Sequence, residues 1–412
     1  MYRTGGLPLL IFFSAIITAA GYALVERACV QDERVRATGA CAATLAAGLL
    51  GIVNWGLRPQ AFSFLLFGAL VYVLEAYRLS RSRTVWAIPF LFALWANLHG
   101  GFVFGLTLLG IYVLAALAED LIRKRWLTPA TLKLLGVALL SGLALCLNPG
   151  GPIGLLRYVI GFAQSQTTLN ANLEFQPLSI REQDGLVFFV LMALFVALAY
   201  RRRVAFPLYM VLSLAVFGFL SLYTRRVLPW FGMVAGPAFS LTLLSHNAPI
   251  ADAPRRQPTK RAINYFMVAV LLVAVVIDLP WLRPFLVHPP MPTDVMVTRT
   301  PVQASQELCR QAAARRVYSD LGYSSYLEWA CPALPIFMDT RFELYPTDMW
   351  QDYISIANGV SGWESKLAKY GIDVLFLRKT PLGPLVTVAR SSPAWQILYE
   401  DTDAIILMQK SW

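Results

Sequence analysis

Polar residues that could do chemistry stand at the junctions between long apolar stretches of this sequence. The run WANLHGGFVFGL at 95–106 places Asn97, His99, Gly100 and Gly101 between apolar flanks. An imidazole can exchange a proton near neutral pH, and an amide can both donate and accept a hydrogen bond. We therefore expect Asn97 and His99 to line a polar cavity, with His99 as a catalytic candidate. The alternative is a histidine whose hydrogen bonds are already satisfied, beside glycines that only end a helix.

Three arginines stand at similar junctions, Arg58 in LRPQAF and Arg225 with Arg226 in YTRRVLPW. The planar guanidinium group binds a phosphate or a carboxylate through two parallel hydrogen bonds. We expect the three side chains to form a binding site for an anionic group. The alternative is that each one reaches lipid phosphates or pairs with a neighbouring acid.

Carboxylates that could act as a general base occur in the loop NANLEFQPLSIREQDG, which contains Glu174 and Asp184. A base that takes the proton of an attacking hydroxyl must be held within hydrogen-bonding reach of it. Glu174 is the predicted catalytic base, followed by Asp339 and Asp184. The other residues predicted to bind substrate are Gln60, Asn148, Gln176, Asp339 and Arg341.

The composition places these residues in a membrane protein. Of the 412 residues, 57% are hydrophobic and 14% charged, whereas soluble domains have about 25% charged residues. Apolar segments near the length of about 20 residues that a helix needs to cross a bilayer recur along the chain. We expect ten spans, at about 6–25, 38–57, 60–77, 85–98, 101–119, 131–147, 185–200, 204–222, 227–245 and 262–281.

Clusters of basic residues predict the orientation of these spans. They lie at 78–83, 123–133, 201–203 and 255–261, in every second loop, so we place these loops in the cytoplasm. This distribution also argues against nucleic-acid binding, despite the net charge of +11. The polar junctions described above then lie outside, whereas Asp32 and Glu33 fall in a cytoplasmic loop and are interpreted as solvated. The N-terminus is placed outside too, which predicts that Met1 is an internal start or a truncation.

From about residue 300 the pattern changes to short strands alternating with helices, which predicts a small α/β domain. The expected organisation is a transmembrane domain at 1–283 and an extracytoplasmic α/β domain at 284–412. Strands are expected at 316–320, 334–339, 372–378, 395–401 and 404–409, and helices at 323–330, 347–358, 362–371 and 381–391. Asp320, Tyr323, Asp339, Arg341 and Glu343 fall at strand ends, where they either hold a ligand or dock onto the membrane domain.

The numbers and positions of the cysteines and histidines indicate whether disulfides or metal sites are expected. Cys309 and Cys331 share the C-terminal domain, where we expect free thiols, with a disulfide as the alternative in an oxidising compartment. The sequence has three histidines and no CxxC motif, so we expect no structural zinc site. We expect no cofactor, and leave open whether a divalent metal takes part.

Several of these runs together resemble a widespread group of bacterial multi-pass membrane proteins that is similar to the GT-C type of glycosyltransferases. The runs are RPQAFSFLLF, WANLHGGFVFGL, LNPGG, EFQP, SDLGYSSYLEW, FMDTRFELY and YGIDVLFL, and the resemblance covers about residues 7–410. One departure is Glu174-Phe175-Gln176, where the group usually has Glu-Trp-Gln.

The resemblance implies an α-helical, GT-C-like membrane domain in the bacterial plasma membrane, followed by the external α/β domain. It also implies that a sugar passes from a polyprenyl-phosphate carrier on the outer face to a glycan or lipid acceptor. GT-C enzymes usually hold a catalytic carboxylate in a long external loop after the first helix. The first loop of this sequence is short and cytoplasmic, so we expect that this N-terminal helix and acidic loop are missing.

Two other classes of function remain as alternatives. The missing acidic loop favours a non-catalytic membrane protein on the same scaffold, which binds lipid-linked glycan or assembles with a partner. A transporter would need broken or paired half-helices near the middle of the membrane. The sequence has one short segment of this kind, and it is expected near the outer surface.

Overall fold

A computed structural model describes residues 2–123, 126–164, 173–243, 261–282, 285, 300–311, 315–341, 345–379 and 383–410. Helices make up 71% of the structure, and the chain divides into two compact units. The first contains Met1–Ile160 and Asn172–Pro280, and the second contains Gly161–Ala171 and Trp281–Trp412. The predicted basic residues 255–260, the end of the span at 227–245, and Glu343 lie outside the described residues.

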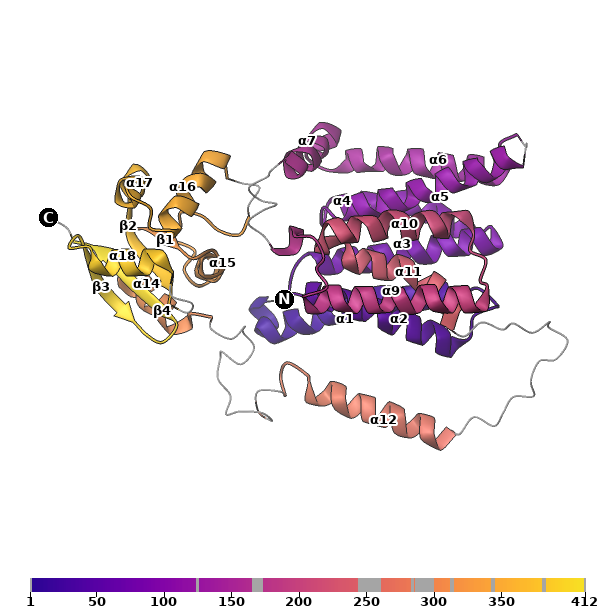
Figure 1. Cartoon of the computed structure of the whole chain (residues 1–412), viewed down its shortest axis with the longest axis horizontal. Coiled ribbons are helices and arrows are strands. Elements are labelled where there is room, and N and C mark those ends of the chain that lie inside the picture. Colours follow the sequence, from indigo (N-terminus) through magenta and orange to yellow (C-terminus); the bar gives the residue numbers. More distant parts are fainter. Residues whose placement is uncertain are drawn as a thin grey trace. The chain divides into compact units, whose positions relative to one another are not determined.

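The described part of the first unit is built from helices (Figure 1). They are α1 (Tyr2–Val30), α2 (Ala37–Gly51), α3 (Gln60–Ser80), α4 (Ile88–Ala96), α5 (Phe102–Ile122), α6 (Pro129–Ala144), α7 (Gly151–Gln164), α9 (Gln183–Arg202), α10 (Leu208–Tyr223), α11 (Leu228–Leu243) and α12 (Arg261–Ile277). Short 3-10 turns precede α4 (η2, Arg83–Ala87) and α11 (η5, Arg225–Val227), and another lies at Leu173–Phe175 (η4). Helix α7 had not been predicted from the sequence.

Six helices among the described residues are long and apolar enough to cross a membrane, as the composition predicts for a membrane protein. Their bounds are Thr4–Val30, Ala37–Asn54, Gln60–Ser80, Phe102–Ile122, Pro129–Leu147 and Gln183–Arg202. Three further apolar helices are shorter, Arg83–Ala96, Leu208–Tyr223 and Val268–Ile277, and they fall in segments that had been predicted as spans. The total of ten spans stays a prediction.

Close contacts between small residues set how the helices of the first unit pack. Gly21 of α1 faces Gly68 of α3, and Gly232 of α11 faces the backbone of Ala47 in α2. Small residues at such crossings let helix backbones approach each other within a bilayer. Helix α11 packs against α1, α2, α3, α9 and α10, and its residues from Leu228 to Thr242 are all buried. It is therefore a central helix of this unit.

The second unit is a small α/β domain with a four-stranded sheet in its described part. The strands are β1 (Arg316–Ser319), β2 (Ile372–Arg378), β3 (Trp395–Glu400) and β4 (Ala404–Gln409), in the order β1-β2-β4-β3. β1 and β2 are parallel, and the other two pairs are antiparallel. The helices are α14 (Val302–Gln311), α15 (Leu321–Ala330), α16 (Thr347–Ala357), α17 (Trp363–Lys369) and α18 (Pro384–Ser391).

Alternating side chains of the central strands bury both faces of this sheet. Leu375 and Leu377 pack with α16, α17 and α18, whereas Val374 and Phe376 pack with α14 and α15. A sheet covered on both faces explains why IDVLFLR is a nearly continuous apolar run. The strand predicted at 334–339 is wrong, because only a single bridge joins Ile336 to Val317. Pro335 lacks the N–H group that a longer ladder would need there.

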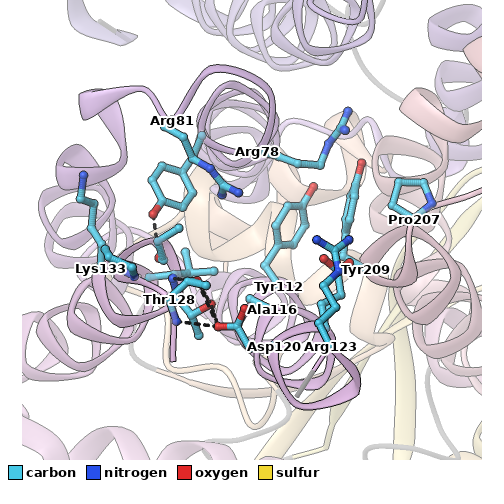
Figure 2. Close-up of a pocket in the computed structure, with 17 residues that line it drawn as sticks. Arg78, Arg81, Tyr112, Ala116, Asp120, Arg123, Thr128, Lys133, Pro207 and Tyr209 are labelled. Atoms are coloured by element: carbon cyan, nitrogen blue, oxygen red, sulfur yellow. Dashed lines mark hydrogen bonds between the residues drawn. The ribbon is translucent and has the colours of Figure 1, made fainter. Parts of the chain in front are cut away.

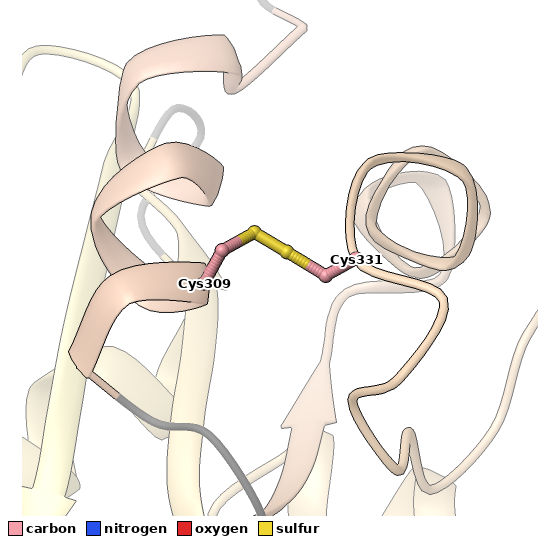
Figure 3. Close-up of a disulfide and its surroundings, with 2 residues drawn as sticks. All are labelled: Cys309 and Cys331. Atoms are coloured by element: carbon pink, nitrogen blue, oxygen red, sulfur yellow. A yellow bond between two sulfur atoms is a disulfide. The ribbon is translucent and has the colours of Figure 1, made fainter.

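A disulfide joins Cys309 and Cys331, so the expectation of two free thiols is wrong (Figure 3). It links α14, a helix that had not been predicted, to the residue that follows α15. The two Cα atoms are 6.0 Å apart, a separation that a disulfide spans without backbone movement. The sequence showed both cysteines but could not show that α14 would bring them together.

Candidate functional site

One end of the first unit gathers most of the residues predicted to form a site, and we call it the Arg58 end. The N-terminal ends of α3 and α5 and the C-terminal ends of α4 and α6 meet there. Ser63 of α3 contacts His99 just before α5, and Asn148 after α6 donates to the carbonyl oxygen of Ala96 at 2.8 Å. We call the opposite end of α3 and α5 the Arg81 end.

Arg58 and Glu174 form an ion pair at the Arg58 end, although 116 residues separate them in the chain. The Arg58 side chain is 56% exposed and that of Glu174 is 26% exposed, so the pair is open to a ligand. Glu174 lies in η4, and its backbone carbonyl oxygen accepts a hydrogen bond of 3.1 Å from the Thr224 hydroxyl. The structure thus brings the predicted base to one of the predicted anion-binding arginines.

Arg225 lies beside this pair but has acidic partners of its own. It forms ion pairs with Glu182 and, at 3.8 Å, with Asp184. Its backbone N–H donates to the carbonyl oxygen of Gln176 at 3.1 Å, which holds the Glu174 segment next to η5. The three arginines therefore do not form one cluster of free cations. The ion pairs of Arg58 and of Arg225 match the alternative in which each arginine binds a neighbouring acid.

Arg226 lies over the ring of Phe175, with its guanidinium carbon 4.9 Å from the ring centroid. A cation over an aromatic face is attracted by the negative potential of the ring. The aromatic residue in Glu174-Phe175-Gln176 thus positions Arg226. Its positive charge also lowers the pKa of His99.

His99 is held by a chain of hydrogen bonds that starts at a buried indole. Trp95 Nε1 donates to Ser63 Oγ at 2.7 Å, and Ser63 Oγ lies 2.8 Å from His99 Nδ1. The backbone N–H of Gly101 also donates to Nδ1, at 3.1 Å. Because Nδ1 accepts, the hydrogen of the neutral ring belongs on Nε2.

The pKa of His99 is low, which keeps the ring neutral at pH 7. Burial lowers this pKa first, and the positive charge of Arg226 lowers it further, to about 4. A neutral ring with its hydrogen on Nε2 can donate a hydrogen bond to a ligand. The arrangement therefore suits His99 as a hydrogen-bond donor better than as a general base.

The predicted amide residues have different surroundings at this end. Asn97 donates to the carbonyl oxygen of Ala93 in its own helix at 2.7 Å, and it is exposed. Asn148 accepts from the N–H of Gly150 at 2.9 Å and shapes the turn into α7. Gln60 is buried in the first turn of α3.

Three buried donors at this end have no hydrogen-bond partner among the described residues. They are Gln60 Nε2, Arg225 Nε and Trp230 Nε1. A buried donor without an acceptor costs about 1–3 kcal/mol, so such groups are typical of sites that a ligand or water completes. Trp230, in the first turn of α11, had not been singled out in the sequence.

A groove of about 920 Å³ lies between α1 and α2. Its lining is mostly apolar, and it includes Ile11, Ala15, Leu45 and Leu49. The groove reaches Trp55, Gly56 and Leu57, and a Cβ atom on Gly56 would lie 3.6 Å from Nε of Arg58. Arg58 therefore follows directly after the residues that line one part of the groove.

Asp339 and Arg341 belong to the second unit and pair with each other there. Arg341 Nε donates to Asp339 Oδ2 at 3.0 Å, and the guanidinium group also contacts Glu328. Burial of Asp339 raises its pKa, but the hydrogen bonds from Arg341 and Tyr345 outweigh this effect and hold the pKa at about 2. This network stabilises the turn after Met338 and gives Asp339 little strength as a base.

Sequence reasoning missed Ser63, Trp95 and Thr224, whose side chains tie the site together. Ser63 follows Gln60 by three residues and so lies on the same side of α3, a spacing that could have shown it.

The prediction that Asp32 is solvated is wrong, because Asp32 is buried and paired with Arg34 and Arg78. Within the described residues, no cluster of three His, Cys, Asp or Glu could hold a metal ion.

The chain was compared with protein families and with curated proteins. No protein-family model matches the chain, and no curated protein matches it.

Proposed function

We propose that the protein is a membrane glycosyltransferase of the GT-C type, which uses a sugar carried on a lipid phosphate at the Arg58 end. The observation that carries this proposal is the ion pair of Arg58 with Glu174, because Arg58 directly follows Leu57, which lines an apolar groove. One residue type binds a phosphate, the other accepts a proton, and the groove accommodates a hydrocarbon chain. These are the three features that a lipid-phosphate sugar donor and a hydroxyl acceptor require.

The proposed step is a displacement at the anomeric carbon of the sugar. The acceptor hydroxyl forms the new C–O bond while the bond from the anomeric carbon to the carrier phosphate breaks, and the polyprenyl phosphate leaves. Glu174 takes the proton of the acceptor hydroxyl. Arg58 stabilises the charge of the leaving phosphate, and Nε2 of His99 and the unpartnered donors of Gln60 and Trp230 bind sugar or phosphate oxygens.

We propose that the Arg58 end faces the outside of the bacterial plasma membrane. Every second loop of the sequence is basic, and the basic residues Arg81, Arg83 and Lys133 lie at or near the Arg81 end. The disulfide of the second unit fits an oxidising compartment, so this unit is placed outside as well.

A non-catalytic protein that binds lipid-linked glycan is the second candidate. One observation favours it: the carboxylates near this end are already in ion pairs. Glu174 pairs with Arg58, and Glu182 and Asp184 both pair with Arg225. A carboxylate that binds a guanidinium group is a weaker base unless the ligand displaces its partner.

Purified protein in lipid vesicles with a labelled polyprenyl-phosphate sugar and a hydroxyl acceptor distinguishes these candidates. The Glu174→Gln variant is expected to bind the carrier while turnover falls at least about 100-fold. The Arg58→Gln variant is expected to lose carrier binding, because it removes a charge-assisted contact to phosphate. The matched control is Arg83→Gln, an exposed arginine near the Arg81 end, which is expected to leave both unchanged.

The outcomes distinguish the two candidates and also test the site itself. Carrier binding without turnover in the wild-type protein would support the non-catalytic binder. Turnover that survives both substitutions, or an absence of carrier binding, would remove the Arg58 end as the site.

A further inference from the structure

A second cavity, of about 780 Å³, lies at the Arg81 end. The ends of α3 and α5, the start of α6 and the start of α10 line it, and Figure 2 shows the side chains around it. Because α3 has 21 residues, about 30 Å of helix separates this cavity from Arg58. The cavity is therefore a different site from the one proposed above, and the inference does not depend on that proposal.

The basic residues of this cavity outnumber its acids. Arg78, Arg81, Arg123 and Lys133 line it, with Glu119 and Asp120 as the carboxylates. Arg81, Arg123 and Lys133 form no ion pair with a carboxylate in the described part of the chain, so their charges are available to a ligand.

The carboxylate of Asp120 lines the cavity, and its Oδ2 atom is engaged by α6. It accepts from the N–H of Thr128 at 2.9 Å, from the Thr128 hydroxyl at 3.0 Å and from the Thr131 hydroxyl at 2.7 Å. These bonds anchor the first turn of α6 to the end of α5. Asp120 therefore has a structural role as a helix anchor.

A buried network fixes the inner wall. Glu75, which is 2% exposed, accepts from Tyr112 at 2.6 Å and pairs with Arg78 at 3.0 Å. Arg78 also lies over the ring of Tyr209, 5.3 Å from the centroid. The wall is therefore held in place before any ligand binds.

The Tyr209 hydroxyl has room for a further hydrogen bond in the cavity. The residue is 6% exposed and lines the cavity; the Glu75 carboxylate acts on its hydroxyl, but no described residue meets that hydroxyl with good hydrogen-bond geometry. A buried hydroxyl of this kind is normally satisfied, so an oxygen-rich ligand in the cavity would complete it. Arg81, Arg123 and Lys133 would balance the negative charge of the same ligand.

The surroundings of the cavity favour a lipid as the source of that ligand. Trp126 is 96% exposed, and Leu121 and Ile122 are also strongly exposed beside the cavity. Tryptophan is enriched at membrane–water interfaces, and basic pockets between transmembrane helices bind anionic headgroups. We propose that this cavity binds the phosphate headgroup of an anionic phospholipid, through Arg81, Arg123 and Lys133.

The test measures phosphatidylglycerol bound to the full-length protein, by native mass spectrometry and by titration in neutral-lipid nanodiscs. Each single substitution, Arg81→Gln, Arg123→Gln or Lys133→Gln, is expected to weaken binding about fivefold, and two together about 25-fold. The matched control is Arg201→Gln, a basic residue at the end of α9 that does not line the cavity. Thermal unfolding of every variant checks that the fold is retained.

Two results would overturn the proposal. Phosphatidylglycerol binding that does not change in the Arg81→Gln/Arg123→Gln variant, or that falls as much in Arg201→Gln, would show that the cavity is not the site. Competition by soluble glycerol phosphate at concentrations equal to the lipid would assign the cavity to a water-soluble phosphate compound. Loss of lipid binding in the cavity variants only, without such competition, supports the proposal.

Discussion

A Cβ atom on Gly68 would lie 2.2 Å from the backbone carbonyl oxygen of Gly21, and one on Gly21 would lie 2.5 Å from that of Phe64. Helices α1 and α3 thus touch backbone to backbone at these two glycines. Because a carbonyl group cannot move aside as a flexible side chain can, any larger residue must push the helices apart. This crossing holds α1, one wall of the apolar groove, against the helix that begins at the site.

Gly68→Ala is therefore expected to destabilise the first unit by about 1–3 kcal/mol, a typical cost of overpacking. Unfolding of the purified protein in detergent, followed by tryptophan fluorescence, measures this loss. Gly136→Ala in α6 is the matched control, because a Cβ atom there meets nothing within 4 Å. Equal stability of the two variants would contradict the close contact of α1 with α3.

Ser63→Ala is expected to destabilise the first unit by about 1–3 kcal/mol, because Trp95 Nε1 and His99 Nδ1 both lose a partner. The control is Ser221→Ala, since the Ser221 hydroxyl bonds only to the carbonyl oxygen of Phe217 in its own helix. The same unfolding measurement compares the two. If Ser221→Ala were the more damaging change, the chain from Trp95 to His99 would not be a structural element.

Replacing both Cys309 and Cys331 by serine is expected to lower the stability of the second unit by about 3 kcal/mol, from the length of the loop that the disulfide closes. Thermal unfolding followed by near-ultraviolet circular dichroism measures the change. Alkylation of the denatured protein is expected to modify three cysteines, Cys29, Cys41 and Cys146, before reduction. Modification of all five without reduction would show that the disulfide does not form.

Acid is expected to weaken the second unit through Asp339. Its pKa in the folded protein, about 2, lies below the value of about 3.9 of an unfolded aspartate. The stabilisation is therefore present above pH 4 and is lost as the pH falls towards 2, by about 1–2 kcal/mol. The free energy of unfolding is measured between pH 5 and 2. We expect this pH-dependent loss to be absent in Asp339→Asn and present in the control Asp348→Asn, which alters an exposed residue.

The proposed orientation predicts which loops a membrane-impermeant maleimide reaches in intact cells. With Cys29, Cys41 and Cys146 replaced by serine, Pro177→Cys near Glu174 is expected to react from outside. Leu127→Cys, in the loop between α5 and α6, is expected to react only after the cells are opened. Both positions are exposed, so a difference in labelling reports the side of the membrane. The reverse pattern would invert the assignment of outside and cytoplasm.

The sequence predicted most of the helices well because long apolar segments and their boundaries are local properties. Strands β2 and β4 were also visible, since IDVLFLR and AIILMQ are short apolar runs bounded by polar residues. Helix α14 was missed because its run, VQASQELCRQ, has few apolar residues, and Ala304 and Leu308 become buried only through tertiary packing. Residues 334–339 were mistaken for a strand because their apolar composition hid the effect of Pro335.

The candidate site could be predicted in its residue types but not in its pairings. Arg58, His99 and Glu174 were recognisable as polar residues at helix ends that share one side of the predicted membrane. That Glu174 binds Arg58, while Arg225 binds Glu182 and Asp184, depends on how η4 packs against η5. Such contacts join residues far apart in the chain, and a single sequence has no local signal for them.

The burial of α11 has a consequence for how the protein is made. The residues of α11 from Leu228 to Thr242 are all buried, so no side of this stretch is left for lipid. Its surroundings come from α1, α2, α3, α9 and α10, all of which the ribosome completes first. Helix α11 therefore has to pack between helices that are already made. A defect in the earlier helices would therefore first leave α11 outside the bilayer, where quality-control proteases can reach it.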